Sequence, residues 1–423
     1  MKYTKFKNGA YNIHLINTDK FKTISIRVNF KRKVNKEEVT MRNLLTRVLL
    51  ESNEFYKTSR LIEIETENLS GLMLRNSSTI SGNYSIMCFE SSFLNEEYTE
   101  KNMTSKSLDF IFKFIFNPDI ENKKFNKKNF DLCKESLKQD ILSIKENPNR
   151  YGLLKMLQTM DKDAPYSICV DGNLEDLEKI TEESLYEYYK QVIKSDLIDI
   201  FVIGDINENW IKQIINDKFQ INTLKKPSQS HYIKHKKINK KIKTKTEKKQ
   251  LEQSKLYIGC KLDNLTPFEQ KYVMNIYSFI LGGSPNSKLF ANLREKNSLC
   301  YAVGCTYQPV TNLLIIKAGI DAINTKKSVN LIKQEMKNIE KGLITDEEIN
   351  AGIITYKNTF KEIEDNPFSI ISAYTSCEYL DYDPIETRTK EIEKVDKETI
   401  MKVARKINID TIFLLEGEQD EED

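Results

Sequence analysis

Histidine is scarce in this chain, whose 423 residues contain three histidines and a single tryptophan. Imidazole is the commonest metal ligand and a frequent general base, so the scarcity leaves three places for such chemistry. His14 stands in an alternating apolar run, which favours a structural role. His231 and His235 would share one face of a helix at a spacing that can bind zinc, but their lysine-rich surroundings offer no neighbouring cysteine or acidic ligand.

Cysteine is also sparse and shows no paired motif. The seven cysteines are scattered, odd in number and without a Cys-x-x-Cys pair, which favours reduced thiols in the cytosol. Cys300 and Cys305 could bind a metal together with other groups. Their spacing inside an apolar strand pattern is more typical of structural residues.

Other absences restrict the class of protein. With 14 glycines and 9 prolines the chain has no collagen-like or long low-complexity segment, and 39% hydrophobic with 30% charged residues is typical of globular proteins. No apolar run is long enough to span a membrane, and the first residues lack a signal-peptide pattern. A net charge of +3 is too small for the whole chain to bind a polyanion. We therefore expect a soluble cytoplasmic protein without membrane or nucleic-acid partners.

The apolar pattern predicts a duplicated α+β fold. In the first half it predicts strands and helices, the strands at 23–30, 72–75, 84–89 and 198–203 and the helices at 39–50, 59–69, 105–116, 128–145, 150–160 and 182–193. The second half repeats this order, with strands at 255–262, 300–307, 313–320 and 411–415 and helices at 266–281, 286–296 and 399–407. One helix in each half should end before a proline, at Asn147-Pro148 and Asn366-Pro367. We expect two similar domains, each an antiparallel-rich sheet packed with helices, arranged as a clamshell half.

The composition suggests where these domains begin and end. The length alone favours two domains of about 200 residues each, which we place at 1–221 and 251–416. Residues 222–250 are predicted to be a lysine-rich linker ending in a strand, because 221–250 carry eleven lysines. Salt-dependent nucleic-acid binding by this linker is an alternative, although Tyr232 is its only aromatic residue. Residues 417–423 are expected to form an acidic tail.

The most specific local signal is ILGGSPNSKLFANLREKNSLCYAVGC, residues 280–305. Its Gly-Gly loop, Leu-Arg-Glu-Lys segment and following tyrosine resemble the glycine-rich loop and Arg/Tyr segment of the pitrilysin/insulinase (inverzincin) peptidase superfamily. The stretches NTDKFKTISIRVNF (17–30) and 163–177 further resemble zinc-free, processing-peptidase-like members in Gram-positive bacteria. That branch is associated with elongation factor P modification, and related proteins with bacteriocin maturation.

The resemblance also indicates a degenerate zinc site. Catalytic members carry His-x-x-Glu-His on the first helix, where two imidazoles hold zinc and the glutamate acts as general base. The corresponding positions here are Asn43, Thr46 and Arg47, and a guanidinium opposes a dication. The third ligand would fall near 133–135, where Glu135 is interpreted as a surface carboxylate. The resemblance therefore implies that this chain binds no metal or other cofactor, and that zinc belongs to a partner subunit.

The second candidate site is the Arg/Tyr segment. The resemblance assigns to Arg294 and Tyr301 a catalytic role in trans, in which they hold the substrate carbonyl and the developing oxyanion. It assigns peptide binding to the loop residues Gly282, Gly283 and Ser284. Alternatively, Arg294 pairs with Glu295 or caps a helix, Tyr301 packs on the sheet surface, and the glycines end a helix in the left-handed conformation.

Two functional hypotheses follow from the resemblance. The first is a non-catalytic, zinc-free subunit of a heterodimeric zinc metallopeptidase, inactive alone and paired with a zinc-bearing homologue for proteolytic peptide processing. The alternative is a catalytically inactive peptide-binding protein, a homodimeric or monomeric clamp that assists another maturation or modification enzyme. A neighbouring reading frame encoding a similar chain with His-x-x-Glu-His would favour the first.

Overall fold

The computed structural model describes residues 1–9, 11–219, 230–235 and 241–418. Its contacts cluster into two compact units. The first contains Met1–Ser143, Cys169–Gln229 and Asn366–Ser372, and the second contains Ile144–Ile168, Ser230–Asp365 and Ala373–Asp423. The segment 144–168 thus groups with the second unit although it precedes the expected linker, and 366–372 groups with the first.

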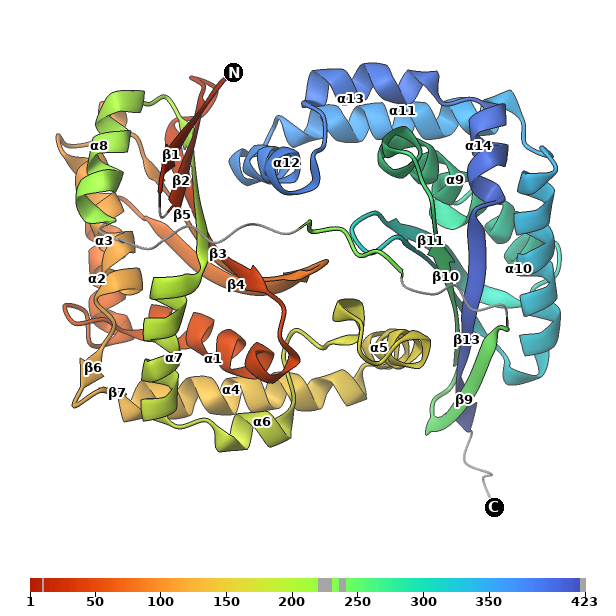
Figure 1. Ribbon diagram of the computed structural model, residues 1–423, viewed down its shortest axis with the longest axis horizontal. Coiled ribbons are helices and arrows are strands. Elements are labelled where there is room, and N and C mark those ends of the chain that lie inside the picture. The colour runs from red at the N-terminus through yellow and green to blue at the C-terminus, as the bar shows by residue number, and fades with distance from the viewer. Residues whose placement is uncertain (10, 220–229, 236–240, 419–423) are drawn as a thin grey trace. The chain divides into compact units, whose positions relative to one another are not determined.

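The first unit is built on a six-stranded sheet of order β1-β2-β8-β3-β5-β4 (Figure 1). Its strands are β1 (Lys2–Asn8), β2 (Tyr11–Asn17), β8 (Leu197–Gly204), β3 (Thr23–Lys33), β5 (Tyr84–Leu94) and β4 (Met73–Ser81). β2 and β8 are parallel, and the other neighbours are antiparallel. β-branched residues in the run LIDIFVIG of β8 suit a strand that is buried on both faces.

Helices cover one face of this sheet. They are α1 (Val39–Glu51), α2 (Ser59–Asn68), α3 (Met103–Phe116), α4 (Lys127–Glu146), α6 (Leu174–Lys179), α7 (Glu182–Ser195) and α8 (Glu208–Lys218), with a small hairpin of β6 (Ile120–Glu121) and β7 (Lys124–Phe125). Buried apolar side chains of α1, α3, α7 and α8 form one core with Ile26, Val28 and Phe30 of β3. Removing this apolar surface from water is the main force that holds these helices to the sheet.

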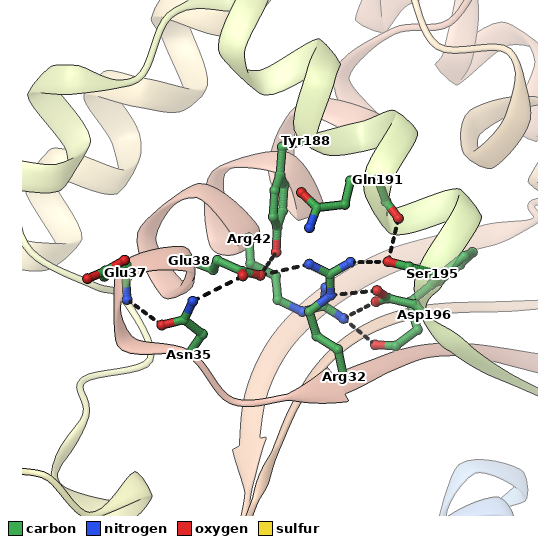
Figure 2. A network of polar contacts seen from close by, with 10 residues as sticks. Arg32, Asn35, Glu37, Glu38, Arg42, Tyr188, Gln191, Ser195 and Asp196 are labelled. Carbon is green, nitrogen blue, oxygen red and sulfur yellow. Dashed lines mark hydrogen bonds and ion pairs between the residues drawn. The ribbon is translucent and has the colours of Figure 1, made fainter. Parts of the chain in front are cut away.

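A buried polar network fixes the start of α1 (Figure 2). Arg42 of α1 donates to the carbonyl of Phe30 and to Asp196 Oδ2, each at 2.6 Å. Arg32 of β3 binds Asp196 Oδ1 at 2.6 Å and Glu38 Oε2 at 2.7 Å. Because Arg42 is almost fully buried, loss of Asp196 would leave its charge uncompensated, whereas Asp196 is also paired with Arg32. The network therefore links α1 to β3 and to the end of α7. It also fixes the position of the following turn of α1.

The second unit repeats the strand order of the first. Its sheet has the order β11-β12-β10-β13-β9, with β9 (Lys243–Gln250), β10 (Ser254–Leu262), β11 (Cys300–Gln308), β12 (Leu313–Ile320) and β13 (Ile407–Glu418). β9 and β13 are parallel, as are β2 and β8, and the remaining neighbours are antiparallel. The order matches β4-β5-β3-β8-β2, so β1 is the additional strand of the first sheet. The predicted duplicated α+β fold is confirmed, and β9 is the counterpart of β2.

Helices pack on both faces of the second sheet. α9 (Met274–Ser278), α10 (Thr325–Glu340), α11 (Asp346–Ile363) and α14 (Lys397–Ala404) share a core with one face, and α12 (Pro367–Leu380) and α13 (Ile385–Glu391) connect α11 to α14. On the other face, Met156 and Met160 of α5 (Pro148–Met160) pack with Tyr257 and Phe413. No helix within the described residues is both long and apolar enough to cross a membrane.

The two Asn-Pro steps start helices as well as end them. The Asn147 side chain accepts hydrogen bonds from the first turn of α5, and Asn366 does the same for α12. In each case proline is the first helical residue. A backbone N–H at this position has no acceptor within the helix, so its absence in proline costs no helical hydrogen bond.

Two lysines of β9 have structural contacts. Lys243 Nζ donates to the carbonyl of Met160 at 2.7 Å, at the C-terminal end of α5. Lys249 Nζ donates to the carbonyl of Lys145, near the end of α4. Cations suit these positions because the C-terminal carbonyls of a helix carry partial negative charge.

Candidate functional site

The predicted degenerate metal site lies on the middle of α1, and its residues bind one another and neighbouring elements. Asn43 Nδ2 donates to the carbonyl of Val170 at 3.0 Å. Arg47 Nε donates to Asn43 Oδ1 at 2.9 Å. Thr46 Oγ1 donates to the carbonyl of Arg42 at 2.8 Å and lies 2.9 Å from Ser78 Oγ of β4. The polar groups at these positions are therefore engaged in hydrogen bonds.

The guanidinium of Arg47 also connects α1 to α4. Its Nη2 lies 2.7 Å from Asp140 Oδ2, and its Nη1 donates to Ser136 Oγ at 3.2 Å. Sequence reasoning missed Ser136 and Asp140, whose i,i+4 spacing on α4 is the only signal that they share a helix face. Glu135, one residue before Ser136, is exposed and accepts a bond from Gln139 of its own helix.

The electrostatics of this region do not suit a metal dication. The Arg47 charge is held in place by three side chains, and a second positive charge nearby would be repelled. Burial raises the pKa of the neighbouring Cys133 thiol to about 12, so it is not a ready thiolate ligand. Within the described residues, no three His, Cys, Asp or Glu side chains gather to hold a metal ion.

The three histidines lie elsewhere. His14 is buried, with Nε2 3.2 Å from Asp199 Oδ1 and Nδ1 2.7 Å from the Tyr3 hydroxyl, in keeping with its predicted structural role. Residues 230–235 are not helical, so the condition under which His231 and His235 would share a helix face is not met. The His231 ring stacks on Tyr379, whereas His235 Nε2 lies 3.1 Å from the carbonyl of Asn312.

The Gly-Gly loop ends a π-type turn, Phe279–Gly283, and the interpretation of its glycines as left-handed helix ends is wrong. Gly282 is buried, and a Cβ there would lie 2.8 Å from Cys305 Cβ and 2.9 Å from its backbone nitrogen. Position 282 therefore needs glycine because β11 approaches so closely. Gly283 is exposed and Ser284 half-buried, which leaves this edge of the loop accessible. Burial raises the pKa of Cys305 to about 12, which suits a structural thiol.

Arg294 and Tyr301 lie together at the surface of the second unit. Arg294 belongs to the π-type turn Phe290–Glu295, and Tyr301 stands at an irregularity near the start of β11. The Arg294 guanidinium carbon is 5.2 Å from the Tyr301 ring centroid and 4.8 Å from that of Phe290. Tyr301 is 74% exposed, far more than a tyrosine packed on a sheet. The structure brings the predicted pair together as two accessible donors, and π-type turns occur often at functional sites.

Comparison with known proteins shows which proteins the chain is similar to. The model of the peptidase M16 inactive domain matches residues 179–356. The probable inactive metalloprotease YmfF of Bacillus subtilis is 28% identical over 421 residues, covering 98% of this chain and 97% of that protein. The crystal structure of a conserved protein from Enterococcus faecalis has a TM-score of 0.93 at 26% identity, covering 99% of this chain and 100% of that one. An uncharacterized zinc protease of Rickettsia felis is 26% identical over 187 residues, covering 44% of each chain.

These similarities agree with the fold and with the duplicated sheets. Over nearly its whole length the chain is similar to an inactive-type member of the pitrilysin (M16) peptidase superfamily. The resemblance predicted from residues 280–305 is thereby confirmed.

Proposed function

We propose that this chain is the zinc-free subunit of a heterodimeric zinc metallopeptidase in the cytoplasm. The partner, a homologue with an intact His-x-x-Glu-His motif, supplies zinc and the general base. This chain supplies Arg294 and Tyr301 to the substrate carbonyl, and the loop Gly282–Ser284 to the peptide. Alone, it hydrolyses nothing.

The observation that carries this proposal is the exposure of Tyr301 together with the position of the Arg294 guanidinium beside its ring. Catalytic donors must reach a substrate oxygen, and Tyr301 is 74% exposed with the Arg294 guanidinium beside its ring. A phenol and a guanidinium aimed at one oxygen stabilise the negative charge that grows there during peptide hydrolysis. By contrast, the side chains of Asn43, Thr46 and Arg47 are committed to hydrogen bonds. Arg294 and Tyr301 are therefore accessible, whereas the side chains at the predicted metal positions make hydrogen bonds within the chain.

The comparisons support the existence of suitable partners as a class. The superfamily contains relatives described as zinc proteases, including the Rickettsia felis protein and YmxG of Bacillus subtilis, which is 26% identical over 186 residues. Bacillus subtilis therefore encodes both an inactive-type and a zinc-protease-type relative of this chain.

Co-expression tests the proposal. The chain would be tagged, expressed with a zinc-bearing homologue from its own genome, purified, and assayed on a pool of fluorogenic peptides. We expect a stable heterodimer that cleaves peptides, whereas each chain alone does not. A matched control is the homologue with its motif glutamate changed to glutamine, which should assemble without cleaving. If the homologue is fully active alone and does not bind this chain, the proposal fails and the peptide-binding clamp becomes the better account.

A further inference from the structure

We propose that the Arg47 guanidinium is a peptide-recognition group, which binds a backbone carbonyl oxygen of an extended peptide. The inference rests on the peptide-binding part of the proposed function and adds a contact in the first unit. It assigns to the degenerate metal position a binding role in place of a catalytic one.

The hydrogen-bonding capacity of Arg47 is the first argument. A guanidinium carries five N–H donors. Within the described residues, Asn43 and Ser136 accept hydrogen bonds from it and Asp140 forms an ion pair with Nη2, so N–H groups are left for another acceptor. A quarter of the side chain, 25%, is exposed.

The position of Arg47 beside an edge strand is the second argument. β4 is the last strand of the first sheet, so one side of its backbone has no strand partner among the described residues. An extended peptide can add a strand to such an edge. Two contacts join β4 to the same turn of α1. Thr46 meets Ser78, and Asn76 Nδ2 donates to the carbonyl of Thr46 at 2.7 Å. A peptide paired with β4 would therefore pass close to the next residue on the helix, Arg47.

Local charge decides between a carbonyl and a carboxylate as the ligand. Asp140 already forms an ion pair with Arg47, and Asp171 lies 3.4 Å from the Asn43 amide. Glu51 follows Arg47 by one helical turn, and both charges act on the Cys133 thiol. The Asp140 carboxylate, already paired with the guanidinium, repels an additional anion. A neutral carbonyl oxygen meets no such repulsion and still accepts a charge-assisted hydrogen bond.

The test measures binding of a fluorescein-labelled, random-sequence peptide pool to the full chain by fluorescence anisotropy. Arg47→Gln should weaken binding by roughly ten- to a hundredfold, as loss of a hydrogen bond to a charged group does. Asp140→Asn should bind as well as wild type or better, because it releases the guanidinium from a competing acceptor. Arg60→Gln, at an exposed arginine of α2, is the matched charge control and should change nothing. Amidating the peptide carboxyl termini should also leave affinity unchanged.

Each contrary result has a separate meaning. If Asp140→Asn weakens binding as much as Arg47→Gln, Arg47 only joins α1 to α4 and the inference is overturned. Equal binding by Arg47→Gln and wild type overturns it as well, provided that both unfold at the same temperature. Loss of binding to amidated peptides would identify a carboxylate ligand instead of a carbonyl. If wild type binds no peptide at all, the peptide-binding part of the proposed function fails, not this contact alone.

Discussion

Position 47, which the family resemblance predicts to correspond to an imidazole of active members, carries a guanidinium. Hydrogen bonds to Asn43 and Ser136 and an ion pair with Asp140 hold it, and Ser136 and Asp140 belong to α4. The same helix carries Glu135, which points to solvent and bonds to its own helix. Charge and geometry at this site therefore agree in opposing a bound dication.

The first prediction concerns zinc. The purified chain, equilibrated with zinc and then dialysed against a mild chelator, should retain far less than one zinc per chain. The physical reason is that Asn43 and Arg47 offer no imidazole and that the Arg47 guanidinium repels a dication. Elemental analysis beside a zinc-bearing homologue in the same buffer measures this. One retained zinc per chain would contradict it.

Sequence and structure differ most at single residues. The family resemblance implied that Arg294 and Tyr301 act as a pair, and the structure places them beside each other on one short segment. Asp140 could not be linked to Arg47 in this way, because contacts between distant helices have no signature in spacing. For Gly282, the alternative of a left-handed helix end was wrong, and its peptide-binding role stays a prediction. Its constraint is the approach of β11 from outside its own segment, not a left-handed backbone.

The elements themselves were more predictable than their contacts. Strongly patterned segments such as β3, β8 and α1 lie within a few residues of their predicted ranges, because alternation and helical periodicity report burial directly. β1 was missed. Its run KYTKFKN is rich in lysine, as suits an exposed edge strand, and so has little apolar contrast. α10 was also missed, although its sequence is amphipathic.

Gly282 and Gly283 provide an element-level prediction about the loop before β11. Gly282→Ala should lower the free energy of unfolding by about 1–3 kcal/mol, because a methyl group there would overlap Cys305 on the neighbouring strand. Gly283→Ala is the matched control. Its nearest contact would be 3.2 Å from the Ser278 carbonyl oxygen, and a smaller loss is expected. Urea unfolding measures the free energy of unfolding of both variants. Equal losses of stability would show that the close approach of β11 is not the reason why position 282 needs glycine.

At the scale of the whole chain, duplication extends from strand order to single ion pairs. Lys31 pairs with Asp199 at 3.0 Å in the first sheet, and Lys261 with Asp410 at 3.1 Å in the second. Both pairs join the central strand to the closing strand and are nearly buried. Position in the sequence does not decide which core a segment joins. α5 lies in the first half of the sequence but belongs to the core of the second unit.

The packing of α5 in the core of the second unit predicts how a chain that is cut between the two halves behaves. Trace trypsin should cut first within 221–242, where the lysine-rich sequence precedes β9. The two fragments should stay together in native buffer and separate in denaturant, because Met156 and Met160 of the first fragment pack against Tyr257 and Phe413 of the second. Native and denaturing size-exclusion chromatography distinguish the states. Fragments that separate without denaturant would show that this packing is weak.

The central claim is that Arg294 and Tyr301 act on a substrate whose zinc belongs to another chain. The most direct measurement is the catalytic constant of the assembled heterodimer with Tyr301→Phe in this subunit. Loss of one oxyanion donor should lower that constant by roughly ten- to a thousandfold and leave peptide affinity nearly unchanged. Arg294→Ala should reduce the rate and also weaken binding, and the double variant should be less impaired than the product of the two effects. Wild-type cleavage by a normally assembled Tyr301→Phe complex would contradict the account.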